Sequence, residues 1–151
     1  MAVKVTGGSA IRKAMREYPQ LVEQAGRVST RRAMTIIRDQ AKANAKEFDR
    51  KETPEKIYRN ITIHEAKKRG KAEKSVIMRV GVLGGARKGG GDTWYWRLME
   101  FGFTHKSGKR FRGYHFMLRA FTSKVGRVTN AMGEYMNKEL NRYSKRASPQ
   151  R

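Results

Sequence analysis

Two long series of apolar residues, one near each end of the chain, place the strongest constraint on the fold. In both series the apolar positions recur every three or four residues, which is typical of amphipathic helices that bury one face. The first series contains Ile11, Met15, Tyr18, Val22, Ala25, Ala33, Ile36, Ile37, Ala41 and Phe48. The second contains Leu118, Phe121, Val125, Val128, Met132, Tyr135, Met136, Leu140 and Tyr143.

These patterns predict a helical segment from Ser9 to about Phe48 and a second helix from about Met117 to Lys145. Ser9 is a suitable N-cap, because its side chain can accept a backbone N–H bond. Pro19 cannot donate its backbone hydrogen bond, so we expect either a kink there or a short helix followed by a longer one that begins near Pro19.

The segment between the helices predicts a β-hairpin. Polar residues 49–56, which include Pro54, form a loop in this interpretation, and residues 57–65 and 75–83 alternate in the manner of half-buried strands. The fold class is therefore α+β: a long N-terminal helix, an antiparallel hairpin or small sheet with an extended basic loop, and a long C-terminal amphipathic helix. We expect residues 1–145 to form one domain and residues 146–151 to form a flexible tail.

The charge is strongly one-sided, with 35 Lys and Arg against 13 Asp and Glu, for a formal net charge of +22. So large a positive field attracts nucleic acid or acidic protein surfaces. Much of the excess positive charge lies in two segments, the tip of the predicted hairpin and residues 104–113. The second segment belongs to a stretch from Phe101 to Gly133 that has no acidic residue. The candidate contacts with DNA or a partner are Lys67, Lys68, Arg69, Lys71, Lys106, Lys109, Arg110 and Arg112. The first four form one group and the last four another. For each group the alternative interpretation is a loop whose cations contact only solvent.

Residue patterns typical of enzymes are missing from the sequence. The absence of cysteine excludes disulfides and thiol chemistry. His64, His105 and His115 have no recognised metal spacing, and no nucleophile elbow is present. The glycine-rich residues 84–92 lack the Gly-Lys-Ser/Thr order of a phosphate-binding loop and are interpreted as a linker. We therefore expect no catalytic residue, metal or cofactor.

No apolar run approaches the roughly 18 residues of a membrane span, and the first ten residues lack the apolar core of a signal peptide. We therefore expect assembly in the cytosol and no membrane partner.

Residues 94–103 form the densest aromatic cluster in the chain. Stacking on bases is one interpretation of it, but aromatic side chains interleaved with Leu98 and Met99 favour a core position. Glu100, within this cluster, is expected to pair with an arginine. Phe121 is expected to be a core residue of the C-terminal helix.

The order of these segments resembles that of the tail-completion, or head–tail joining neck protein, family of long-tailed bacteriophages (siphophages). Two motifs carry the resemblance, which extends from the first helix to Leu140. One is the aromatic box Tyr95-Trp96-Arg97-Leu98-Met99-Glu100-Phe101-Gly102, and the other is His115-Phe116-Met117-Leu118-Arg119-Ala120-Phe121. The residues that we assign to the family box and core are Tyr95, Trp96, Glu100, Phe101, Gly102, Phe116, Leu118 and Phe121.

The sequence departs from the family pattern at two places. Family members commonly carry proline where this chain has His115, and a Thr-Gly turn where it has Thr53-Pro54. These departures concern local loop geometry more than the fold.

The resemblance implies a structural virion protein that assembles as a ring, six-fold like the tail. This ring would lie in the phage neck, between the head-closure ring and the tail terminator or tube, around the DNA channel. Two other classes stay open from the residues alone. A stand-alone basic nucleic-acid-binding protein would also have this charge, whereas a nuclease is disfavoured because the chain has no carboxylate cluster.

Overall fold

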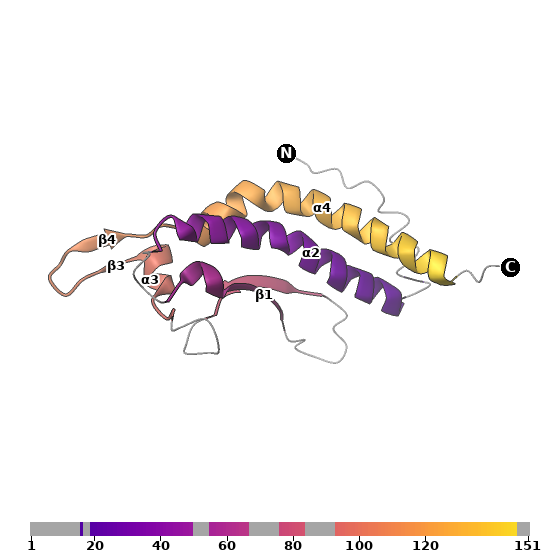
Figure 1. Ribbon diagram of the computed structural model, residues 1–151, viewed down its shortest axis with the longest axis horizontal. Helices are drawn as coiled ribbons and strands as arrows, with labels where there is room; N and C mark the ends of the chain where they lie inside the picture. The colour runs from indigo at the N-terminus through magenta and orange to yellow at the C-terminus, as the bar shows by residue number, and fades with distance from the viewer. Residues whose placement is uncertain (1–15, 17–18, 50–54, 67–75, 84–92, 148–151) are drawn as a thin grey trace. The chain divides into compact units, whose positions relative to one another are not determined.

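The computed structural model describes residues 16, 19–49, 55–66, 76–83 and 93–147. Two long helices, α2 (Pro19–Lys46) and α4 (Phe116–Ala147), flank all the other described elements in the sequence (Figure 1). Between them come the 3-10 turn η1 (Ile57–Asn60), strands β1 (Ile61–Glu65) and β2 (Met78–Val82), helix α3 (Trp96–Phe101), and strands β3 (Gly102–Thr104) and β4 (Arg110–Arg112). Strand β1 pairs with β2, and β3 with β4, in two separate antiparallel sheets. The α+β class predicted from the sequence is confirmed.

The helix boundaries follow from local chemistry. Helix α2 begins at Pro19, a position where the missing N–H of proline would have no intrahelical partner anyway. Helix α4 begins at Phe116, close to the predicted start. The predicted N-cap Ser9, the tip of the first hairpin, the glycine linker and residues 148–151 lie outside the described residues.

The first predicted strand is shorter than expected, because residues 57–60 form a 3-10 turn instead. The Asp49 carboxylate accepts the backbone N–H groups of Ile57 at 3.3 Å and Tyr58 at 3.0 Å. These donors would otherwise be unsatisfied at the start of a helical turn. The predicted alternation is confirmed in β1, where Ile61 and Ile63 are buried and His64 is exposed.

The contacts divide the chain into two compact units, to which α2, β1, β2 and α4 each contribute residues. Unit 1 comprises Met1–Ile36, His64–Arg79 and Gly126–Arg151. In it, the Ser29 hydroxyl lies 3.6 Å from the Met136 sulfur, and the Arg32 guanidinium lies 4.8 Å from the centre of the Tyr135 ring. Small side chains on α2 permit this close approach to α4. The buried residues of unit 1 include Val22, Ala25, Ser29, Ala33, Met78, Val128 and Glu139.

Unit 2 comprises Ile37–Ile63 and Val80–Val125. Its core holds a buried polar link: the Asn60 amide donates to the Thr93 hydroxyl at 2.9 Å, and this hydroxyl donates to the Leu83 carbonyl at 2.7 Å. The Asn44 amide likewise donates to the Phe116 carbonyl at 3.0 Å, in the first turn of α4. The buried residues of unit 2 include Ile37, Ala41, Asn44, Ala45, Ile57, Asn60, Ile61, Ile63, Thr93, Glu100, Phe116 and Ala120.

Candidate functional site

The basic segment 104–113, whose two glycines and many cations are typical of a loop, forms most of a β-hairpin made by β3 and β4. Strand β3 pairs with β4 in the register Gly102–Arg112, Phe103–Phe111 and Thr104–Arg110. The turn is closed by two backbone bonds, from His105 N–H to the Lys109 carbonyl at 2.8 Å and from Gly108 N–H to the His105 carbonyl at 2.9 Å. Figure 1 shows this hairpin extending beyond α3.

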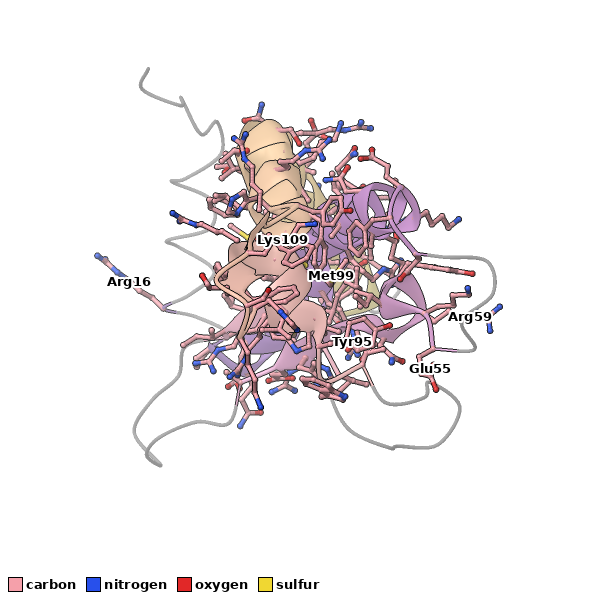
Figure 2. The ribbon with its side chains drawn as sticks, turned by 90° about the vertical axis from the view of Figure 1, so that its left-hand side faces the viewer. Arg16, Glu55, Arg59, Tyr95, Met99 and Lys109 are labelled. Carbon is pink, nitrogen blue, oxygen red and sulfur yellow. The ribbon has the colours of Figure 1, made fainter. Side chains whose placement is uncertain are left out.

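Because side chains alternate along a strand, the hairpin has one aromatic and one basic face. Phe103 and Phe111 are direct cross-strand partners, and their rings stack with centroids 4.8 Å apart. The ammonium group of Lys109, labelled in Figure 2, lies 5.3 Å from the centre of the Phe111 ring. Arg110 and Arg112 alternate with Phe111 and therefore belong to the opposite face. Both phenylalanines keep more than a third of their surface exposed.

The charges of the hairpin are not neutralised within the described part of the chain. Lys106, Lys109, Arg110 and Arg112 are exposed, and none forms an ion pair with a described residue. Acidic side chains are used elsewhere: Glu23 and Glu65 contact Arg27, and Glu47 contacts Arg119. No acidic residue that the structure describes therefore balances the cations of the hairpin.

Two glycines lie at the root of the hairpin, where the backbone around Gly102 packs closely against the backbone around Gly113. Gly102 has φ 81°, in the left-handed region that favours glycine, and its N–H donates to the Leu98 carbonyl to end α3. A Cβ on Gly102 would clash with the Phe111 carbonyl, and one on Gly113 would clash with the Glu100 carbonyl. The Gly102 position of the aromatic box is thus explained by close approach of the backbone.

Glu100 connects α3 to α4 at the same root. Its side chain is buried, and its two carboxylate oxygens accept the backbone N–H groups of Met117 at 2.9 Å and Leu118 at 3.1 Å. These are N-terminal donors of α4, and a negative charge is favourable at that end of a helix. The expected pairing of Glu100 with an arginine is wrong, because the backbone N–H groups of α4 are its partners.

His115, the residue just before α4, has φ 50°. A proline is fixed near φ of about −65° and could not adopt this conformation. The family pattern has proline at this position, and the backbone conformation of His115 explains why proline would not fit in this chain. The His115 N–H donates to the Glu100 carbonyl at 3.1 Å, and Tyr114 N–H donates to the Met99 carbonyl at 2.7 Å.

An open groove of about 740 Å³ runs along the hairpin and its root. Its walls combine aromatic rings with cationic or titratable side chains. Residues that line it include Phe101, Phe103, Phe111, Arg110, Arg112 and His115. Phe101 is 70% exposed, although the aromatic box was interpreted as core.

The first turns of α4 carry a second exposed apolar surface. Leu118 is 54% exposed, Phe121 51% and Val125 41%. Phe116, by contrast, is fully buried, with Phe48 5.3 Å away between ring centroids. The expectation that Leu118 and Phe121 are core residues is therefore wrong for this chain, because the core contacts of α4 begin on the face of Phe116 and Ala120. We call Leu118, Phe121 and Val125 the apolar row of α4.

Tyr95 and Trp96, also in the family box, are half-buried. The Tyr95 hydroxyl donates to the Glu55 carbonyl at 3.4 Å (Figure 2). Burial raises the pKa of the Tyr95 phenol above its ordinary value, and the negative charges of Asp49 and Glu55 raise it further. The phenol is therefore a neutral structural group at neutral pH.

Sequence reasoning found the cations of the hairpin but missed its geometry. Phe103 and Phe111, the stacked pair, were not singled out. Phe103 and Phe111 lie at equal distances from Ser107 in the sequence, and this symmetry was the available signal, since aromatic residues placed symmetrically about a turn favour a hairpin. The candidate contacts at the first hairpin tip, Lys67, Lys68, Arg69 and Lys71, lie outside the described residues and stay predictions.

The described residues contain no group of three or more His, Cys, Asp and Glu side chains that could hold a metal ion. None of the described helices is long and apolar enough to cross a bilayer.

The described residues thus include an exposed aromatic and basic hairpin and an exposed apolar face of α4. Residues 9–102, more than half of the chain, match the family model HK97-gp10_like, described as "Bacteriophage HK97-gp10, putative tail-component". The chain belongs to this family, and the resemblance to a phage tail component is confirmed. No curated protein and no solved structure gives a significant match. The protein is thus a structural component of the phage tail and hence of the virion.

Proposed function

We propose that this tail component is a tail-completion, or head–tail joining, protein of the phage neck. In this proposal it forms a six-fold ring around the DNA channel and connects the head-closure ring to the tail terminator or tube. The ring assembles in the host cytoplasm. The membership of the chain in a phage tail family supports the structural part of the proposal.

The main observation in support of a ring is the exposed apolar row of α4. Leu118, Phe121 and Val125 lie on one side of the helix, because their spacings of three and four residues match the helical repeat. Exposed contiguous apolar surfaces of this kind mark sites of protein association. In a cyclic oligomer the row would pack against a different surface of the next subunit.

The hairpin cations support a position beside DNA or an acidic neighbouring ring. Repeated around a ring, Lys106, Lys109, Arg110 and Arg112 would balance phosphates without reading bases. The same cations would speed docking onto an acidic partner.

A substitution in the apolar row tests the ring. Purified wild-type protein is expected to sediment as one discrete oligomer and to show rings by electron microscopy. Phe121→Asp places a charge in the apolar row and is expected to give monomers with unchanged helical circular dichroism. Ser123→Asp adds the same charge at an exposed position on the opposite side of α4 and is expected to leave the ring intact.

A wild-type protein that stays monomeric and binds duplex DNA tightly would contradict the proposal and favour the stand-alone nucleic-acid binder. Such a binder shows a steep salt dependence, with log K falling by about 0.9 per unit of log salt for each phosphate neutralised. A ring-forming neck protein is expected to bind short duplexes weakly.

A further inference from the structure

Strand β4 has an open edge in the described part of the chain. The sheet that contains it consists of β3 and β4 only, so one side of β4 pairs with β3 and no described strand pairs with the other. An open edge presents backbone N–H and C=O groups that can pair with a further strand. A two-stranded sheet is also only marginally stable alone, so a third strand would stabilise it.

The register shows which backbone groups point to that edge. Antiparallel pairs alternate between hydrogen-bonded and non-hydrogen-bonded, and His105 with Lys109 forms a bonded pair. The pairs Thr104–Arg110 and Gly102–Arg112 are therefore non-bonded positions. The N–H and C=O groups of Arg110 and Arg112 point away from β3, toward the open edge.

The side chains of β4 specify what the added strand should contain. Arg110, Phe111 and Arg112 alternate between the basic and the aromatic face. Cross-strand neighbours interact directly, and opposite charges or apolar pairs are favourable there. An acidic–apolar–acidic segment would place a carboxylate beside each arginine and its apolar side chain beside Phe111.

We propose that the open edge of β4 binds an extended segment of another tail protein in which acidic and apolar residues alternate. The proposal rests on the proposed function, since the partner is another protein of the particle. Phe and Arg on the groove walls have the composition of protein interface cores, from which Lys is depleted. Arginine also holds carboxylates in a bidentate geometry that lysine lacks.

Charge argues against the other occupants. If a second copy of this chain paired through its own β4, arginine would lie opposite arginine, which is destabilising. Duplex DNA would balance the arginines but would leave the stacked Phe103–Phe111 pair and Phe101 exposed to solvent. The acidic segment satisfies both faces of the hairpin.

The test uses the full chain and a fluorescent synthetic peptide that alternates Glu with Val and Thr, with the Glu→Gln peptide and a short DNA duplex as comparisons. Replacing the groove arginines in the double variant Arg110→Gln/Arg112→Gln is expected to weaken Glu-peptide binding by about tenfold or more, because charge-assisted hydrogen bonds are lost. The matched double variant Lys106→Gln/Lys109→Gln removes the same charge from side chains that do not line the groove. It is expected to weaken binding only about two- to threefold, the size of a screened surface interaction. Circular dichroism of both variants checks that they fold.

Hydrogen exchange supplies a readout specific to strand addition. The amides of Arg110 and Arg112 are expected to exchange more slowly in the presence of the Glu peptide. Equal weakening by the two double variants, no peptide binding, unchanged exchange at these amides, or displacement of the peptide by duplex DNA would each overturn the proposal. Rings seen without peptide binding would overturn the strand addition alone, whereas peptide binding by a protein that forms no ring would contradict the neck ring alone.

Discussion

Phe116 and Phe121 both lie in the first turns of α4, yet one is fully buried and the other half exposed. Phe116 contacts Phe48, and its carbonyl receives the buried Asn44 amide. Phe121 belongs to the apolar row. The apolar series in the sequence contains Phe121 but not Phe116, and the two residues lie about 140° apart around the helix, so the series did not identify the buried ring.

Truncation of the two rings is therefore expected to have different effects. Phe116→Ala should lower the free energy of unfolding by about 3–5 kcal/mol, because it removes a buried ring and leaves a cavity. Phe121→Ala should change it by less than about 0.5 kcal/mol, as exposed substitutions do. Urea denaturation at protein concentrations that keep the chain monomeric measures both. Equal losses would contradict the assignment of Phe121 to the surface.

Glu100→Gln tests the charge at the start of α4. The amide keeps one oxygen acceptor for the Met117 and Leu118 N–H groups but loses the negative charge and the second acceptor. We expect a loss of about 1–2 kcal/mol in the free energy of unfolding. Glu134→Gln, an exposed position within α4, is the control and should change stability by less than about 0.5 kcal/mol. The same small loss in both variants would show that the cap contributes nothing.

At the scale of elements, the hairpin of β3 and β4 depends on the backbone crossing at its root. Gly113→Ala should destabilise the protein, since the new methyl group would meet the Glu100 carbonyl and, at 2.7 Å, the Gly102 nitrogen. Gly126→Ala, in α4, meets nothing within 4 Å and should instead stabilise the helix by about 0.5–1 kcal/mol. Thermal melting of the two variants should therefore shift in opposite directions. A rise in melting temperature for Gly113→Ala would contradict the close crossing.

The long elements could be predicted from the sequence, whereas the short ones could not. Helices α2 and α4 present the apolar period many times, so their type and approximate bounds were correct. Strands β3 and β4 have three residues each, and Phe103 and Phe111 are their only apolar side chains, so the sequence pattern of alternation is too short to predict strands. Their pairing also depends on Gly102 and Gly113, whose role appears only when two distant backbone segments meet.

The candidate site was predictable in composition but not in arrangement. The sequence identified Lys106, Lys109, Arg110 and Arg112 as exposed cations, since no acidic residue is near them in the chain. It could not show that the arginines alternate with Phe111 on an open strand edge. The sequence also led us to expect that Glu100 pairs with an arginine. Its actual partners, the first backbone N–H groups of α4, come after the β3–β4 hairpin in the sequence, and the geometry of this hairpin was not predicted.

At the scale of the whole molecule, the few acidic residues have structural tasks. Asp49 holds η1, Glu100 holds α4, and Glu47 pairs with Arg119. The four cations of the β3–β4 hairpin, by contrast, have no acidic partner among the residues that the structure describes. Sequence composition alone suggested a general affinity for polyanions, and the fold presents these four cations on one exposed element.

The root of that hairpin also determines how the element behaves under load. Its first strand continues from α3 and its second leads into α4, while backbone bonds at Tyr114 and His115 and the Glu100 carboxylate fasten the two ends together. Because both ends of the hairpin are held by these bonds, tension applied at its tip would pass through the root into the first turns of α4.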